Sequence, residues 1–329
     1  MKKEIQEKLA LFAANAQAAR KEFTWHDTLV KKLAALLYAL DNKPIDCTAI
    51  RNCHTGIKNN TGIFSMFRGN MALCIAAMLS LKENPAEIFG NTMTVYDMMK
   101  SAKFRASDYL VVAAYEIASQ AKPEEYGQTV TRARAFYDGM KSKGFFRTGQ
   151  DDYIFSAMLG LSDIDVRTGT ERIEELYQRF KSAFWSGNSV QALAQILVLS
   201  GECDTAINRI LTLRDAMKSQ KIRLDRAYTL PSLGVLALLP VDIDTLVRDI
   251  DKAQAFLRAQ KGFSSWTVSK QAVLLFASAV IASVYAEDVK SGVTASVSTS
   301  IASIIIAQQA AIIAAVSAST AASAAAAAN

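Results

Sequence analysis

The segment Tyr137-Asp138-Gly139-Met140-Lys141-Ser142 recurs in altered form along the chain, and this recurrence decides the fold. Related segments surround Lys100, Lys181, Lys218 and Lys261, and the lysines follow one another at steps of 41, 40, 37 and 43 residues. A repeat of about 20–50 residues is the sequence signature of a solenoid or related array. The sequence therefore predicts a set of similar units rather than unrelated domains.

A short polar motif and an apolar stretch follow each of these segments. The motif begins with an aromatic or aliphatic residue, as in Phe104-Arg105-Ala106-Ser107 or Trp185-Ser186-Gly187-Asn188, and Phe67-Arg68-Gly69-Asn70 precedes the series. The stretches are rich in small residues and apolar almost all round, which is typical of helices buried between neighbours. We predict buried helices over residues 71–81, 109–119, 153–162, 190–200, 229–239 and 271–283.

The segments between these stretches are amphipathic. In residues 171–180, for example, Ile173, Leu176, Tyr177 and Phe180 share one face at helical spacing. An earlier unit spans residues 29–40 and 47–58, after a lone helix over 3–21. We predict an all-α chain, an α-solenoid of six or seven helical hairpins, open as a superhelix in preference to closed as a toroid. The tetratricopeptide consensus is absent.

Composition restricts the class of protein further. Of 329 residues, 51% are apolar and 21% charged, with five Pro and fifteen Gly, which excludes collagen, a disordered chain and a turn-rich β-sandwich. Four Cys and two His are too few for a disulfide scaffold. The charged start, Met-Lys-Lys-Glu-Ile, lacks the apolar core of a signal peptide, so we expect a cytoplasmic protein with reduced thiols.

All charged residues of the chain lie in residues 1–290, and residues 291–329 contain none. We therefore divide the chain into a helical-repeat domain, 1–290, and an Ala/Ser/Ile-rich tail, 291–329. The tail is expected to form a long helix that supports self-association through the stripe Val297, Ile301, Ile305, Ile312 and Val316. A membrane span over residues 301–323 is the alternative, which Gln308 and Gln309 disfavour.

Stacked hairpins place equivalent residues along one edge, so the polar motifs should form a rim or groove. Arginine and asparagine there could bind the backbone of an extended peptide through side-chain hydrogen bonds. The alternative is that these residues cap helices and bond to the preceding loop. The candidate residues are Arg68, Asn70, Arg105, Asp108, Arg147, Gln150, Asp151, Asn188, Ser189 and Trp266.

The sequence gives only weak evidence for a catalytic site or a metal site. Cys47, Cys53, His54 and His26 could form a thiol–imidazole zinc site, yet no CxxC or HxxxH pair exists, and we expect no metal or cofactor. The adjacent Asp151 and Asp152 could share acid/base chemistry, but their place at a helix start favours a structural role. The net charge of +6 comes from interspersed basic and acidic residues, so we expect no nucleic-acid partner.

Several stretches resemble one known family. These are residues 60–70, 148–153, 186–191 and 260–266, and they are similar to a family of uncharacterised proteins from Gram-positive bacteria, domain-of-unknown-function family 4003. The resemblance runs from about Phe12 to the Ala-rich tail and implies a bacterial origin, but no activity, cofactor or catalytic residue.

The sequence thus favours a non-catalytic helical-repeat scaffold or binding module for a peptide or protein partner, self-assembling through its C-terminal helix. Two alternatives stay open. One is an enzyme on a closed α/α toroid, in which Asp151, Asp152, Arg105 and Arg147 face a polar central cavity. The other is a membrane-associated or filament-forming structural protein whose contact is the tail.

Overall fold

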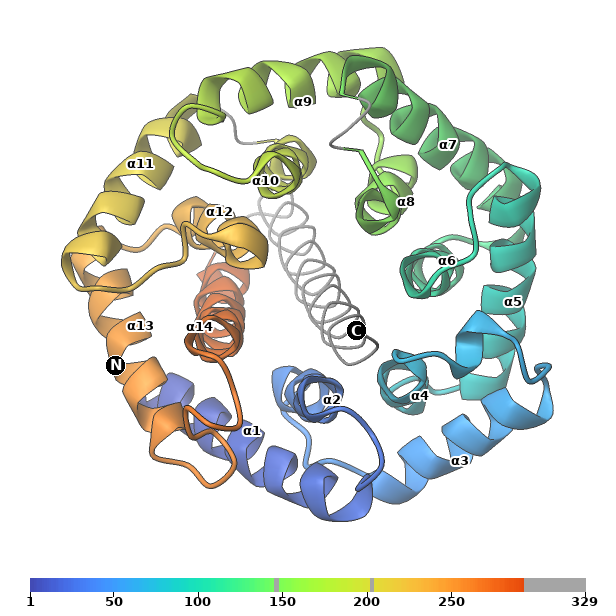
Figure 1. Cartoon of the computed structure of the whole chain (residues 1–329), viewed down its shortest axis with the longest axis horizontal. Helices are drawn as coiled ribbons and strands as arrows, with labels where there is room; N and C mark the ends of the chain where they lie inside the picture. The colour runs from blue at the N-terminus through green and yellow to red at the C-terminus, as the bar shows by residue number, and fades with distance from the viewer. Residues whose placement is uncertain (145–147, 202–203, 293–329) are drawn as a thin grey trace, which may run out of the picture. The chain divides into compact units, whose positions relative to one another are not determined.

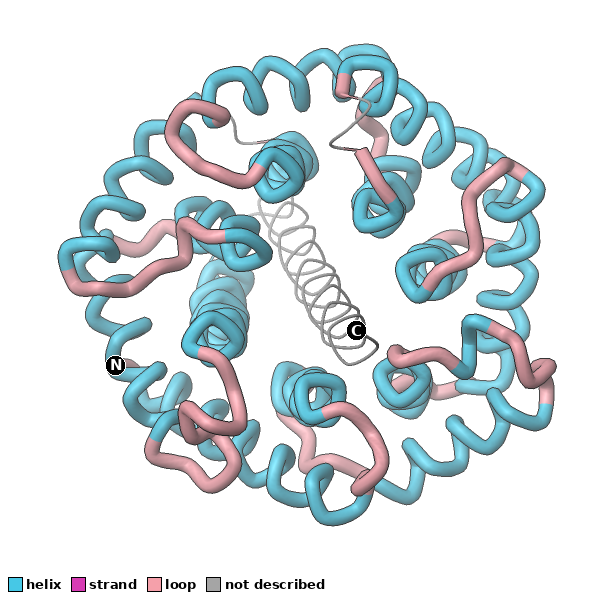
Figure 2. Tube along the Cα trace, in the orientation of Figure 1, coloured by secondary structure: helices cyan, strands magenta, loops and turns pink. Residues whose placement is uncertain are grey.

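The computed structural model describes residues 1–144, 148–201 and 204–292. In this part of the chain all regular structure is helical, as fourteen α-helices and four short 3₁₀ turns (Figure 2). The prediction of an all-α chain is therefore confirmed for the described residues. Arg147 and the predicted tail stripe, Val297, Ile301, Ile305, Ile312 and Val316, lie outside them, so the division at residue 290 stays a prediction.

The described residues fall into two compact units. Unit 1 comprises residues 1–14 and 171–292, and unit 2 comprises residues 15–170. The helices α1 (Lys3–Glu22) and α9 (Val166–Phe180) are divided between the two units. The sequence predicts one repeat domain over residues 1–290, whereas the described residues form two compact units.

Unit 2 is built of two layers of helices. In Figure 1, α2, α4, α6 and α8 form one layer, and α3, α5 and α7 form the other. We call the first set the buried helices and the second the covering helices. Their bounds are α2 (Thr28–Leu40), α3 (Cys47–Asn59), α4 (Ala72–Ser80), α5 (Pro85–Ser101), α6 (Asp108–Gln120), α7 (Tyr126–Lys143) and α8 (Tyr153–Leu161).

Unit 1 repeats this two-layer arrangement (Figure 1). Its buried helices are α10, α12 and α14, while α11, α13 and the unit's parts of α1 and α9 cover them. The bounds are α10 (Gly187–Ser200), α11 (Asp204–Ser219), α12 (Leu230–Leu238), α13 (Ile243–Arg258) and α14 (Lys270–Gly292).

The buried helices lie where the sequence predicts them, because their residues leave no polar face. In α4 every residue from Ala72 to Leu79 is buried, and in α8 every residue from Tyr153 to Gly160. Such helices are stable only between neighbours. The covering helix α9, by contrast, buries Ile173, Leu176 and Phe180 but leaves Glu171 exposed.

Two kinds of start precede the buried helices. Asp27 accepts hydrogen bonds from the first turn of α2, Ser107 from Leu110 N–H and Ser269 from Ala272 N–H, as expected of capping side chains. The helices α8 and α12 instead follow directly on short 3₁₀ turns, η3 (Gln150–Asp152) and η4 (Ala227–Thr229), and have no side-chain cap. The helices α4 and α10 have no side-chain cap either.

The part of α1 that precedes residue 15 belongs to the core of unit 1. Phe12 packs edge-on against Phe263 and Phe276, with ring centroids 5.4 and 5.5 Å apart. Lys8 is buried and forms an ion pair with Glu287 at 2.8 Å. The terminal amino group lies 3.1 Å from the Asp249 carboxylate. The first residues of the chain and its last described helix are therefore packed together.

Within the described residues, one segment is long and apolar enough to cross a membrane, Lys270–Glu287 of α14. In the structure 83% of that segment is buried inside the protein. Its apolar composition is therefore accounted for by packing in the core of unit 1.

Candidate functional site

Two sets of loops connect the helices of each unit, and the two sets lie at opposite ends of the helices. The loops that lead from a covering helix into a buried helix hold all three tryptophans, and we call them the tryptophan loops. Their described residues are 23–27, 60–71, 102–107, 144 and 148–152 in unit 2, and 181–186, 220–229 and 259–269 in unit 1. The loops that return from a buried to a covering helix are named the clasped loops. Every described candidate of the predicted rim lies in a tryptophan loop or in the first turn of the helix that follows it.

Phe23 of the first tryptophan loop is buried, and five later loops each place an apolar anchor in the core. These anchors are Phe67, Phe104, Phe184, Ile222 and Phe263, all at most 5% exposed. The sequence pattern aligned Trp185 with the phenylalanines, and this alignment is wrong by one residue. Phe184 is buried at the core position and packs against Phe180, whereas Trp185 is fully exposed.

Arg68 fixes the second tryptophan loop to the preceding helix. Its guanidinium donates to Thr61 Oγ1 at 3.2 Å and to the carbonyls of Lys58 and Thr61. These carbonyls belong to the free C-terminal end of α3, where a cation is favourable. Asn70, two residues on, is exposed. Arg68 thus has the bonding of a structural residue.

Asp108 joins two successive loops of unit 2. Its carboxylate lies so close to Gly69 that a Cβ there would come within 2.4 Å of Oδ1. Burial raises the pKa of Asp108, while a hydrogen bond from the Met71 backbone lowers it. Burial together with the charges of Asp151 and Asp108 raises the pKa of the neighbouring Tyr109 to about 12. The structure therefore brings Asp108 and Asp151 near one tyrosine.

Arg105 is exposed, and its backbone N–H donates to Tyr153 Oη at 3.2 Å. The preceding anchor, Phe104, lies under the guanidinium of Arg134, which also donates to the Lys103 carbonyl at 2.9 Å. The loop backbone is therefore held, whereas the Arg105 side chain extends from it.

Gln150, Asp151 and Asp152 form the 3₁₀ turn ahead of α8. Asp152 is buried and accepts a hydrogen bond from Gly149 N–H at 2.9 Å, whereas Gln150 and Asp151 are half-buried. This carboxylate satisfies backbone donors near the positive end of a helix. The local geometry agrees with a structural role for Asp152.

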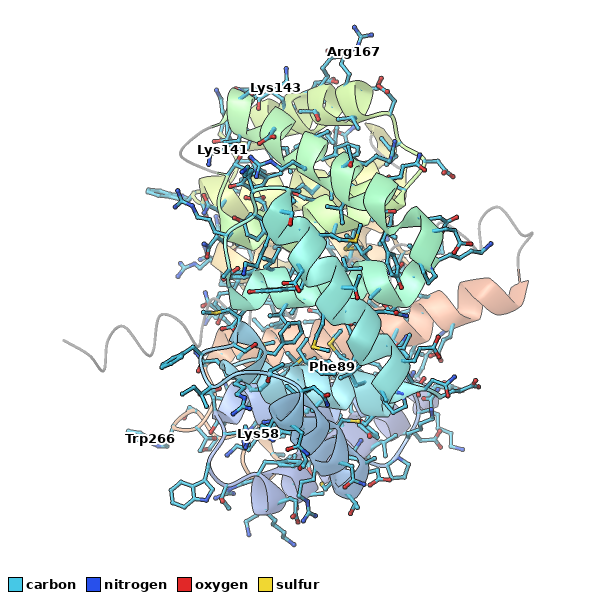
Figure 3. All side chains as sticks on the ribbon, turned by 90° about the vertical axis from the view of Figure 1, so that its right-hand side faces the viewer. Lys58, Phe89, Lys141, Lys143, Arg167 and Trp266 are labelled. Carbon is cyan, nitrogen blue, oxygen red and sulfur yellow. The ribbon has the colours of Figure 1, made fainter. Side chains whose placement is uncertain are left out.

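The candidates in unit 1 lie in two loops. Ser189 is buried in the first turn of α10, with its hydroxyl 2.9 Å from that of Ser186, while Asn188 is exposed. Trp266 is 95% exposed and stands out from the loop before α14 (Figure 3).

The two histidines of the chain meet in unit 2. The rings of His26 and His54 lie edge-on with centroids 5.4 Å apart. Burial, together with Lys58 and His26, lowers the pKa of His54 to about 4, and burial with Lys58 and Lys31 lowers that of His26. Nearby lysines also disfavour a bound cation. Among the described residues no group of three or more His, Cys, Asp or Glu is placed to hold a metal ion.

A buried carboxylic acid lies between α4 and α6. Glu116 is 7% exposed and accepts a hydrogen bond from Gln120 at 2.8 Å. Burial raises its pKa to about 7, partly offset by Gln120 and Lys82. The adjacent Cys74 thiol is fully buried, and burial raises its pKa as well. A protonated thiol is a poor nucleophile, so this cluster lacks an activated group.

An apolar cleft of about 380 Å³ lies between the covering helices α3 and α5. Figure 3 looks onto this side of unit 2, where Phe89 is labelled. Two helical glycines, Gly56 and Gly90, face the cleft, and a Cβ on either would meet nothing within 4 Å. Burial raises the pKa of Cys53, the thiol in its wall. The other lining residues are Asn52, Ile57, Asn60, Leu79, Pro85, Ala86 and Met93.

The clasped loops are held by two arginines of the covering helices α7 and α11, which the sequence interpretation missed. Arg132 donates to the carbonyls of Gly160, Ser162 and Ile164, and Arg209 to those of Ala237, Leu239 and Val241, at the same offsets of 28, 30 and 32 residues. Both arginines stand at the same distance ahead of the recurring Lys141 and Lys218. Aligning the repeats on these lysines would have found them.

The family model for "Protein of unknown function (DUF4003)" matches residues 15–310. The chain therefore belongs to this family, as the resemblance in its loops predicted. Neither a curated protein nor a solved structure matches the chain.

Proposed function

We propose that this protein is a non-catalytic helical-repeat binding module, an α-solenoid of six or seven hairpins that takes a peptide or protein partner. The cleft between α3 and α5 carries the proposal. Its volume of about 380 Å³ falls in the usual range for ligand sites, and its lining is apolar with only Asn52 and Asn60 as polar side chains. A cleft of this composition binds apolar side chains.

The two glycines support a binding role. Glycine in a helix interior costs about 1 kcal/mol of stability relative to alanine, and neither Gly56 nor Gly90 is needed for close packing. Larger residues would fit the helices but would fill the cleft. The partner we propose is an amphipathic helix whose apolar side chains enter between α3 and α5, where Met93 and Cys53 adapt to their shape.

The chemistry of the described candidates agrees with binding rather than catalysis. Arg68 and Asp152 satisfy backbone groups, and the thiols of Cys53 and Cys74 have raised pKa values. None of these groups is an activated nucleophile beside a base.

A randomised peptide display library selected against the full-length protein tests this function. We expect enrichment of apolar, helix-forming peptides that bind the wild type and lose at least about tenfold in affinity with Gly90→Leu, which fills the cleft. Thr94→Leu, on the exposed side of the same helix, is the matched control and should bind normally. Enrichment of no peptide, or equal binding to Gly90→Leu, would contradict the proposal.

A further inference from the structure

Large apolar side chains are exposed in only one kind of place among the described residues. Trp25, Phe64, Trp185 and Trp266 are at least 90% exposed, and Ile63 is 74% exposed. All of them, with the partly exposed Met66, belong to the tryptophan loops. Elsewhere in the described chain the large apolar side chains are packed, so this exposure is a property of one end of each unit.

The tryptophan loops are anchored to the protein, whereas the side chains at their tips are exposed to solvent. In unit 2, Phe67 follows the exposed Phe64 by three residues, is buried, and packs against Phe89 and Tyr96. In unit 1, Phe184 is buried beside Trp185, and Arg214 stacks on it and donates to the Ala183 carbonyl. Arg258 donates to the carbonyls of Phe263 and Val268, on either side of Trp266. The exposed residues are thus displayed on anchored turns.

Basic residues surround these tips in both units. Exposed examples in unit 2 are Lys21, Lys58, Lys103, Arg105 and Lys143, and in unit 1 Lys181, Lys218, Lys221, Arg226, Lys261 and Lys270. Lys58 and Lys143 are labelled in Figure 3. In unit 2 the clasped loops carry more acidic than basic exposed residues, Asp41, Asp46, Glu83, Glu124, Glu125, Asp163 and Asp165 against Lys43, Lys82 and Lys122. Unit 2 therefore presents a basic, aromatic end and a more acidic end, and unit 1 presents a basic, aromatic end.

We propose that the tryptophan loops bind the surface of an anionic lipid membrane, a role beyond the peptide-binding cleft. Tryptophan partitions to the level of the lipid headgroups, where its ring is half in apolar and half in polar surroundings. Lysine and arginine near an anionic surface each contribute about 1 kcal/mol, equivalent to about a fivefold gain in affinity. Isolated tips on short turns suit a deformable lipid surface better than a rigid protein surface, which needs a contiguous complementary patch.

Tryptophan fluorescence provides a direct test, because all three tryptophans of the chain lie in these loops. The full-length protein is titrated with vesicles of phosphatidylcholine and phosphatidylglycerol, and separately with phosphatidylcholine alone. We expect a shift of the emission to shorter wavelength with the anionic vesicles, weakened by added salt. An unchanged spectrum, or the same shift with neutral vesicles, would overturn the proposal.

Variants locate the contact, with binding measured by vesicle sedimentation. Lys58→Gln/Lys143→Gln should weaken binding about 30-fold. The matched control Lys43→Gln/Lys122→Gln, on the clasped loops, should change vesicle binding less than about twofold.

The variant Trp25→Ser/Trp185→Ser/Trp266→Ser should weaken vesicle binding at least about tenfold without changing the melting temperature. Undiminished binding by the tryptophan variant would assign the contact to another surface, and a dimer of the wild type lost in that variant would assign the loops to a second copy; either result overturns the proposal.

Discussion

The clasped loops and the tryptophan loops lie at opposite ends of the helices in each unit and differ in how they treat side chains. At the clasped end, polar side chains turn inward: Arg132 and Arg209 donate to carbonyls at the ends of α8 and α12, and the buried Asn15 donates to the carbonyls of Ala35 and Lys43. At the tryptophan end, large apolar side chains turn outward into solvent. Burying polar groups and exposing apolar ones are both unfavourable unless something offsets the cost.

The offset differs between the two ends. At the clasped end the cost of burying polar side chains is offset inside the protein, because free carbonyls at a helix C-terminus need donors and the arginines supply them. At the tryptophan end no packing inside the described structure compensates the exposure of Trp25, Trp185 or Trp266. Arginines hold the tryptophan loops as well, so the ends differ at their surfaces: the clasped end stabilises the fold, while the tryptophan end also exposes apolar side chains that are available for binding.

Removing an arginine that bonds a clasped loop should have the largest effect on stability. Arg132→Ala leaves the carbonyls of Gly160, Ser162 and Ile164 without their donor, and we expect a loss of about 3–4 kcal/mol in the free energy of unfolding, measured by urea denaturation. Arg167→Ala, an exposed arginine of the same unit, is the control and should stay within about 0.5 kcal/mol. Equal effects of the two substitutions would break the comparison.

The buried Glu116 makes the region beside the clasped loop at Lys82 sensitive to rising pH. Its pKa in the fold, about 7, lies above the ordinary value of 4.5, so the stability due to its neutral form is complete below about pH 4.5 and is lost as the pH rises through 7. Glu116→Gln should therefore raise the free energy of unfolding by roughly 3 kcal/mol at pH 8. The gain should vanish near pH 4.5, and a gain that persists there would contradict this assignment.

The histidine pair gives the tryptophan end of unit 2 the opposite pH dependence. The pKa of His54 is lowered from 6.5 to about 4, so stability is complete above pH 6.5 and is lost as the pH falls through 4. The effect should be smaller than that of Glu116, because His54 is only half-buried. His54→Gln should flatten the acid side of a plot of melting temperature against pH and leave the alkaline side unchanged. An unaltered acid side would show that the pair is not the cause.

The cleft between α3 and α5 should respond to substitution by gaining stability. Gly90→Ala adds helix propensity without a clash, so we expect a gain of about 1 kcal/mol in the free energy of unfolding. Gly160→Ala is the contrasting control, since its Cβ would lie 2.8 Å from the Thr129 carbonyl oxygen, and it should destabilise the protein. Destabilisation by Gly90→Ala would mean that the cleft is not open at this position.

The smallest effect on stability is expected at the tryptophan loops. Trp185→Ser and Trp266→Ser remove side chains that are at least 95% exposed, so the free energy of unfolding should change by less than about 0.5 kcal/mol. Phe184→Ser, one position from Trp185, removes a buried anchor instead and should cost several times more. Similar losses for Trp185→Ser and Phe184→Ser would contradict the assignment of the anchor.

The helices could be predicted from the sequence because composition alone determines which of them are buried. A run such as Ala72–Ser80 has no polar face, and the recurring lysines give the spacing of the units. The loops were harder to predict. Phe184 and Trp185 have similar apolar character, and only the packing around Arg214 decides which of the two is buried.

The site residues illustrate the same limit. Arg68 and Asp108 were recognised as recurring polar positions, but their partners, the carbonyls of α3 and the backbone at Gly69 and Met71, are set by the meeting of successive loops. The cleft was not predicted at all, because its floor and walls come from α3, α4 and α5 together. A glycine at mid-helix, such as Gly90, is the one signal that the sequence offered.

The difference between the two ends is tested most directly by urea denaturation of two matched double variants, Arg132→Ala/Arg209→Ala and Trp185→Ser/Trp266→Ser. Each variant alters two residues at one end only. We predict that the arginine variant loses several kcal/mol, or fails to fold, while the tryptophan variant unfolds at the wild-type urea concentration. Equal losses in the two variants would contradict the separation of a stabilising end from a binding end.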